Sequence, residues 1–249
     1  MTYLLSEINH IGIIMASDSS EARRCQTGEL VFVEVDKTLY FKELNIGIST
    51  WGKSWVGSQN VNEWIKDKFQ EFVFLKKIGP NQALAELTKF LADCFNQKGH
   101  LKLDEDMGLH VAGYNTDEAG AAPGICHVFK EKGSHLFEPQ FTMLSLPKHE
   151  YAYHLRNGIY EEFSMMWPRL LEVDDSFRDL IRKRYLAEVK EFGDPLAVSA
   201  EWLGSWVKQM CLVFKTAGLP EYIGKAVKVL TFNQKGDVRK FRLGEMVNY

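Results

Sequence analysis

The sequence has few cysteines, no long apolar run and no excess of one charge. Its four cysteines are isolated and form no CxxC pair, a pattern typical of thiols in a reducing compartment rather than of disulfides or zinc sites. No apolar stretch approaches the roughly 20 residues that a membrane-spanning helix needs. The formal net charge of −3 shows no basic footprint for nucleic acid or acidic membranes. We therefore expect a cytoplasmic protein with neither nucleic acid nor a membrane as partner.

Signals for export and for cofactors are missing as well. No basic segment precedes an apolar block at the N-terminus, so we expect no signal peptide and a genuine N-terminus, less Met1. No phosphate-binding loop occurs, and the glycines are too irregular for a nucleotide fingerprint. Cys126 and His127 are adjacent, so on a strand they would face opposite ways. We expect no metal, nucleotide or organic cofactor.

Hydrophobic periodicity divides the chain into strands and helices. Strands are expected at residues 2–8, 10–17, 30–35, 37–41, 46–52, 109–114, 124–129, 226–232 and 238–243. Helices are expected at residues 61–72, 84–95, 164–171, 177–189 and from a cap at Ser199 to 213. Residues 19–29 are expected to form a loop, and the region around 134–190 a divergent helical segment. This order predicts a single α+β domain over residues 1–249, with two antiparallel sheets between helix layers.

The second residue carries the most suggestive chemistry. Thr2 becomes N-terminal if Met1 is removed. A terminal threonine then offers a hydroxyl nucleophile and a free α-amine on one residue, which is one way to activate a weak nucleophile. Asp18 ends an apolar run that is typical of the second strand of a hairpin. The two ends of that hairpin could bring Thr2 and Asp18 together.

Motifs spread over most of the chain support a known family. They are Met1-Thr2-Tyr3, residues 12–19, residues 37–40, residues 48–52 and, more weakly, residues 110–114 and 223–229. Together they resemble the proteasome-type branch of the N-terminal-nucleophile (Ntn) hydrolases, closest to the bacterial proteasome-like proteins. The resemblance implies the Ntn-hydrolase fold, a four-layer αββα sandwich of two antiparallel sheets. It also implies self-association into rings or another homo-oligomer, a peptide substrate, and an ATPase as a conceivable partner.

The same resemblance implies a role for each of four residues. Thr2 would attack through Oγ1, and its α-amine, which titrates near about 7.7–8.0 when unperturbed, would act as base through a water. Lys37 would favour the neutral amine and stabilise developing negative charge, and Asp18 would orient Lys37. The backbone N–H of Gly52 would form the oxyanion hole. The implied activity is a threonine-type peptidase with an acyl-ester intermediate on Thr2.

Three of these residues also have a simpler interpretation. A threonine directly after Met is common in any proteome and by itself indicates no function. Asp18 could be a turn residue that bonds its own backbone, and Lys37 an ordinary edge or loop lysine. The residues that should support Thr2 from the second half of the chain are not placed, with Ser164 as a candidate. The sequence favours an enzyme, and it leaves open a catalytically inactive structural subunit of the same fold or a small-molecule amide hydrolase.

Overall fold

The computed structural model shows a mixed chain of helices and antiparallel sheets. It describes residues 2–25, 27–76, 83–98, 107–117, 120–130, 133–134, 136–147, 152–157, 194–216 and 224–245. Within these residues, ten strands form two five-stranded sheets and four more form two small hairpins. The antiparallel α+β class expected from the sequence is therefore confirmed.

The first sheet contains the first and the last of the described strands. Its strand order is β12-β1-β2-β13-β14, and each neighbouring pair is antiparallel. The strands are β1 (Leu4–Asn9), β2 (Ile13–Asp18), β12 (Ala152–Asn157), β13 (Ala226–Phe232) and β14 (Val238–Glu245). All residues of β1 and β2 are buried, because this hairpin lies inside the sheet and is covered on both faces.

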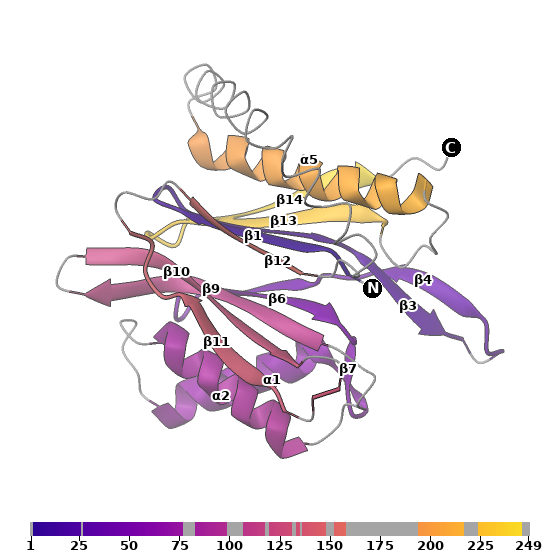
Figure 1. Ribbon diagram of the computed structural model, residues 1–249, viewed down its shortest axis with the longest axis horizontal. Coiled ribbons are helices and arrows are strands. Elements are labelled where there is room, and N and C mark those ends of the chain that lie inside the picture. The colour runs from indigo at the N-terminus through magenta and orange to yellow at the C-terminus, as the bar shows by residue number, and fades with distance from the viewer. Residues whose placement is uncertain are drawn as a thin grey trace.

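The second sheet is formed by the middle of the chain, in the order β11-β10-β9-β6-β5. Its strands are β5 (Thr38–Phe41), β6 (Ile46–Gly52), β9 (Met107–Asp117), β10 (Gly120–Lys130) and β11 (Glu138–Met143). The two hairpins are β3 (Ser20–Arg24) with β4 (Leu30–Glu34), and β7 (Trp55–Val56) with β8 (Gln59–Asn60). The β3–β4 hairpin projects from the body of the molecule (Figure 1).

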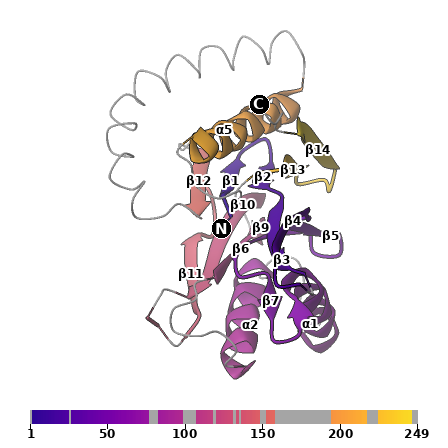
Figure 2. The same ribbon diagram turned by 90° about the vertical axis from the view of Figure 1, so that its right-hand side faces the viewer.

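Among the described residues, three helices cover the sheets on their outer sides. Helix α5 (Pro195–Thr216) lies along the first sheet, whereas α1 (Val61–Lys76) and α2 (Ala83–Lys98) lie under the second (Figures 1 and 2). Asn60 caps α1, since its Oδ1 accepts from the Asn62 N–H at 3.0 Å. The two helices expected at residues 164–171 and 177–189 lie outside the described residues.

Apolar side chains fill the space between these elements in three clusters. One joins the second sheet to α1 and α2, and another joins the first sheet to α5. The third lies between the sheets and includes Met15, Ile125 and Phe232. Successive residues of a strand point to opposite faces of the sheet. On β2, Ile14 therefore packs in the cluster with α5, and Met15 packs in the cluster between the sheets. Burial of both sheet faces is what makes the central strands nearly continuous in apolar residues.

Three local predictions were wrong. Residues 20–24 form β3 rather than a loop, because backbone pairing with β4 orders a polar stretch that has no hydrophobic signal of its own. The expected helical segment around 134–190 contains strands β11 and β12, and residues 158–193 lie outside the described part. Helix α5 begins at Pro195 instead of Ser199, since the Asp194 carboxylate accepts from the Ala197 N–H at 3.1 Å and Pro is favourable in a first turn.

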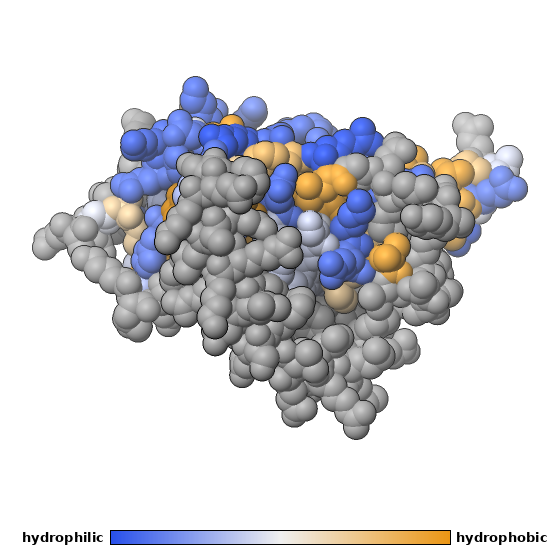
Figure 3. All heavy atoms as spheres, turned by 90° about the horizontal axis from the view of Figure 1, so that it is seen from above, coloured by the Kyte–Doolittle hydropathy of each residue, from blue (hydrophilic) through white to orange (hydrophobic). Residues whose placement is uncertain are grey.

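The surface on the α5 side is mixed in character. Seen from this side, hydrophilic residues predominate among those described, and hydrophobic ones gather in small groups (Figure 3). None of the described helices combines the length and the apolar content needed to cross a lipid bilayer.

Candidate functional site

Thr2, Asp18 and Lys37 meet at one point of the structure. The Lys37 Nζ donates to Thr2 Oγ1 at 3.1 Å and to Asp18 Oδ2 at 2.9 Å. All three residues are buried, with exposed fractions of 4% for Thr2, 0% for Asp18 and 5% for Lys37. The structure therefore brings together three of the four residues that the sequence singled out.

The β1–β2 hairpin places Thr2 beside Asp18. Leu4 lies opposite Ser17 in the register of this hairpin, so the residues just before β1 lie against the end of β2. The Tyr3 N–H donates to Asp18 Oδ1 at 2.9 Å, and the Asp18 N–H donates to the Tyr3 carbonyl at 3.2 Å. Antiparallel pairing thus fixes the position of the Thr2 backbone relative to the carboxylate, as the sequence predicted.

Asp18 has hydrogen-bond donors around its whole carboxylate. Besides Tyr3 and Lys37, its Oδ2 accepts from the backbone N–H of Ser20 at 3.1 Å and of Gly224 at 3.4 Å. The bond from the Ser20 N–H is the turn interaction that the sequence allowed for Asp18. Asp18 therefore both stabilises this turn and pairs with Lys37. A buried carboxylate is tolerated only with such charge-assisted partners, and this set holds Asp18 in one orientation toward Lys37.

Lys37 reaches the site from the segment that precedes β5. Its carbonyl accepts from the Thr50 N–H on β6 at 2.9 Å, which anchors its backbone to the second sheet. Its side chain extends to Asp18 at the end of β2 in the first sheet. A lysine this buried and bonded to two groups is not an ordinary loop lysine. The Lys37–Asp18 ion pair links the two sheets at the position of Thr2.

Gly52, the fourth predicted residue, ends β6 with a φ of +82°, which favours glycine. No contact recorded for the described residues joins it to Thr2, Asp18 or Lys37, so the structure does not place it against the other three. Its neighbour Trp51 is held firmly. The indole N–H donates to His127 Nε2 at 3.1 Å, and an added Cβ on Gly108 would lie 2.5 Å from the indole ring.

Sequence reasoning missed two features next to this site. The Gly224 N–H carried no signal, since a backbone donor is not visible in residue type. Cys211 on α5 is fully buried and lies within electrostatic reach of Asp18 and Lys37. Burial raises the pKa of the Cys211 thiol, and the Asp18 charge raises it further. A neutral, inaccessible thiol does not compete with Thr2 as a nucleophile.

A second polar cluster lies between the sheets. Ser6 Oγ is 2.8 Å from His110 Nδ1, and His110 Nε2 is 2.5 Å from Asn157 Oδ1. A hydroxyl bonded to an imidazole, which is in turn bonded to an amide, is the arrangement of a serine nucleophile with its base. Ser6 is only 1% exposed, however, and His110 is fully buried, so a substrate has no access to the hydroxyl. Burial lowers the pKa of His110 to about 4 and that of His127 to about 3. We assign the cluster to the neutral polar core.

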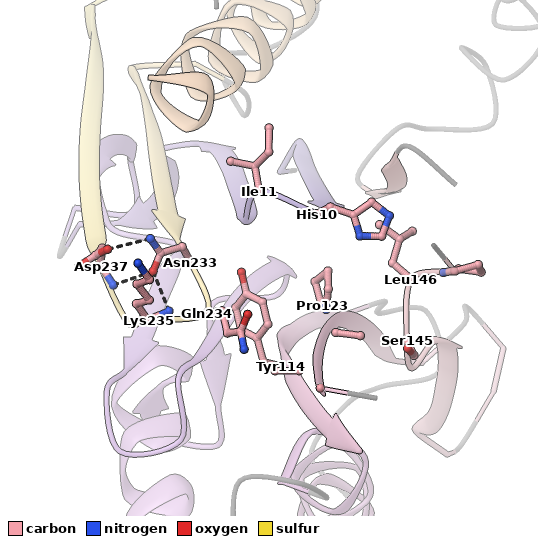
Figure 4. A pocket seen from close by; sticks show the side chains of 14 residues that line it. His10, Ile11, Tyr114, Pro123, Ser145, Leu146, Asn233, Gln234, Lys235 and Asp237 are labelled. Atoms are coloured by element: carbon pink, nitrogen blue, oxygen red, sulfur yellow. Dashed lines mark hydrogen bonds between the residues drawn. The ribbon is translucent and has the colours of Figure 1, made fainter. Parts of the chain in front are cut away.

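A cavity lies at the other end of β1 from Thr2. It has a volume of about 540 Å³ and opens between the β1–β2 turn, the β13–β14 turn and β10. His10 and Ile11 lie above Tyr114 and Pro123, with Lys235 and Asp237 at one side (Figure 4). None of the four predicted site residues lines it. Across the described residues, no three His, Cys, Asp or Glu side chains cluster as metal ligands would.

Comparisons with known proteins give likenesses to solved structures. No protein-family model matches the chain, and no curated protein matches it. Among solved structures, 39 chains match, including Anbu (ancestral beta-subunit) from Yersinia bercovieri. That match has a TM-score of 0.49 at 11% identity, and it covers 99% of this chain and 89% of that one.

These findings overturn the family assignment made from the sequence. A member of the proteasome-type Ntn hydrolases, closest to the bacterial proteasome-like proteins, should match a family model, and none matches. The quoted motifs are short and separated by long unmatched stretches, so they do not add up to a family signature. The 11% identity and TM-score of 0.49 are too low to restore the assignment, and any function has to rest on the geometry of the site.

Proposed function

We propose that the chain is a threonine-type peptidase that uses Thr2 Oγ1 as nucleophile once Met1 has been removed. The observation that carries the proposal is the position of Lys37 Nζ, 3.1 Å from Thr2 Oγ1 and 2.9 Å from Asp18 Oδ2. The ammonium donates to the hydroxyl oxygen and leaves the hydroxyl proton free to be transferred. A cation at this distance also stabilises the negative charge that develops on Oγ1 as the proton leaves.

The base in this proposal is the α-amine of Thr2 itself. Within the described part of the chain, Lys37 is the one titratable side chain that hydrogen-bonds Thr2 Oγ1. Lys37 is ion-paired to Asp18 and donates its protons, so it cannot also accept one. A freed α-amine lies on the same residue as the hydroxyl and can take its proton through one water. With Met1 attached, that nitrogen is an amide and has no basic lone pair.

The reaction then follows from these positions. Oγ1 attacks the scissile carbonyl carbon, and the tetrahedral oxyanion needs donors, for which we propose the Gly52 N–H. Collapse expels the amine, which takes the proton held by the α-ammonium, and leaves an ester on Thr2. Water, deprotonated by the same α-amine, hydrolyses the ester and restores the hydroxyl.

The proposal is tested with Thr2→Ala and Thr2→Ser. We expect Thr2→Ala to lower peptide hydrolysis by at least about 10³-fold, because among the described residues no other hydroxyl hydrogen-bonds the Lys37 Nζ. Thr2→Ser keeps the oxygen and should retain measurable activity. Hydrolysis of a peptide mixture is followed by liquid chromatography with mass spectrometry, and unfolding curves confirm that both variants are folded. Undiminished turnover by Thr2→Ala would rule out the mechanism.

Intact mass adds an independent readout. Purified protein should lack the mass of one methionine, and a peptide epoxyketone, which reacts with a hydroxyl and an α-amine on one residue, should add once per chain. Retention of Met1 together with the absence of an adduct would contradict the proposal that the protein is a threonine-type peptidase.

A second candidate function, an inactive structural subunit of the same fold, is favoured by one observation. Thr2 is only 4% exposed, which leaves little room for a substrate carbonyl beside Oγ1. This candidate predicts retained Met1 and no adduct. A small-molecule amide hydrolase would instead show the adduct and hydrolyse simple amides but no peptides.

The wider architecture belongs to the proposal as well. We propose that residues 1–249 form one domain with a four-layer αββα sandwich. Self-association is also proposed, since Leu30 and Val31 on the projecting β3–β4 hairpin are 44% and 42% exposed. Light scattering after size-exclusion chromatography measures it, and a monomeric mass would contradict it.

A further inference from the structure

A small cavity adjoins the Lys37 side of the proposed catalytic site. Its volume is about 210 Å³, and it is lined by residues 36–38, 228–230 and 240–242. Sites for whole small ligands usually measure about 300–1,000 Å³, so this one suits a single side chain. Lys37 lines this cavity and also donates the hydrogen bond to Thr2 Oγ1.

Strand alternation explains why cations face this cavity. Phe241 of β14 packs in the cluster with α5, so its neighbours Lys240 and Arg242 point to the opposite face, toward β5. Lys240 lies opposite Leu230 in the register of β13 and β14. The paired strands therefore line one side of the cavity with positive side chains and an aliphatic wall.

The carboxylates near the cavity are already paired. Lys228 lies 2.6 Å from Asp36 and 3.1 Å from Glu34, and Arg242 lies 2.8 Å from Glu34. These bridges connect the base of β4 to β13 and β14. Lys240 is exposed, and no ion pair is recorded for it among the described residues. One cation at the rim is thus left to interact with an incoming anion.

We infer that this cavity is a substrate subsite that takes an acidic side chain of the peptide, held by Lys240 at the rim and by the aliphatic wall below. The inference rests on the proposed function, since it assigns a preference to that same site. Because Lys240 is exposed, its ion pair with an acidic side chain of the substrate should strengthen binding only modestly. An exposed ion pair contributes a few tenths to one kcal/mol, which corresponds to about a threefold preference in kcat/KM.

The test uses one peptide sequence in which each position flanking the cleaved bond is in turn Glu, Gln or Lys. We expect kcat/KM for the Glu peptide to exceed that for the Gln peptide by about threefold at one position, and the ratio to fall toward one at 0.5 M salt. Lys240→Glu should reverse the order and favour the Lys peptide. Lys235→Glu is the matched control, because it makes the same charge change on the β13–β14 turn, outside this cavity.

The outcomes separate the two proposals. If wild type cleaves, Thr2→Ala does not, and Glu and Gln peptides are cleaved alike, the subsite is overturned and the proposed function stands. Equal shifts for Lys240→Glu and Lys235→Glu would overturn the subsite too, since they show only the effect of net charge. Activity that persists in Thr2→Ala, or no cleavage of any peptide by the processed wild type, overturns both.

Discussion

At the scale of single residues, the structure is organised around one buried ion pair. Asp18 and Lys37 are both almost fully buried, and each has partners beyond the other. Taking two charges out of water costs several kcal/mol per ion unless hydrogen bonds replace the lost hydration. Here backbone N–H groups solvate Asp18, and Thr2 Oγ1 is one of two recorded acceptors for Lys37. The interaction that stabilises the pair is therefore the same one that polarises the proposed nucleophile.

Replacing Lys37 with Met should damage stability and activity together. The variant leaves the Asp18 carboxylate buried with no cation, a situation that costs about 3–5 kcal/mol, and it removes the charge beside Thr2 Oγ1. Urea unfolding measures the loss of stability, and peptide hydrolysis measures the loss of activity. Lys42→Met is the control, because Lys42 is exposed and its loss should change neither by much.

A double variant separates the two roles of Lys37. Asp18→Asn in the Lys37→Met background removes the stranded charge, so most of the lost stability should return while activity stays absent. Recovery of activity along with stability would mean that Lys37 acts only through the fold.

At the scale of elements, periodicity located most strands and helices, and pairing decided the rest. Strand β13 occupies the predicted residues 226–232, because its apolar run is bounded by clear turn residues. Strands β3 and β11 lack such a run, and their pairing with β4 and β10 could not be read from local sequence. The β6–β9 pair shows a similar non-local constraint, since Gly108 lies directly opposite Trp51.

Gly108→Ala should disturb the end of β6 that carries Gly52. The new Cβ would lie 2.5 Å from the Trp51 indole, and the hydrogen bond to His127 prevents an easy retreat of that ring. Overpacking of this kind typically costs about 1–3 kcal/mol. We expect a lower melting temperature and, if Gly52 supplies the oxyanion donor, a lower kcat.

The second substitution Trp51→Phe provides a rescue. The smaller ring relieves the contact, so stability should improve in the Gly108→Ala background. No destabilisation by Gly108→Ala would show that the two strands separate more easily than this packing implies.

At the scale of the whole molecule, the space between the sheets contains two buried histidines beside the apolar cluster. The rings of His110 and His127 are 5.3 Å apart, and burial keeps the pKa of each far below its ordinary value of about 6.5. The unfolded chain therefore binds protons at these residues at a pH where the folded chain does not. Folded stability from this source is fully present above about pH 6.5 and is lost as the pH falls toward 4.

Acidification from pH 7 to pH 5 should lower the free energy of unfolding by about 2 kcal/mol for each of the two histidines. Urea unfolding measured across this range gives the slope. His127→Gln should reduce the slope by about half, since glutamine can still accept from the Trp51 indole but does not titrate. His10→Gln is the control, because His10 is exposed. If the pH dependence of unfolding were unchanged in His127→Gln, the buried histidines would not be its source.

The sequence by itself determined the α+β class, most strands and helices, and the hairpin that sets Thr2 against Asp18. These features follow from local periodicity and from the fixed geometry of an antiparallel turn, which connect residues close in the chain. Only the tertiary structure decided that Lys37 crosses from one sheet to the other, that Gly224 donates to Asp18, and that Lys240 faces the cavity beside Lys37. Those relations join residues far apart in the chain, and they arise when two sheets pack and exclude water, which no local pattern encodes.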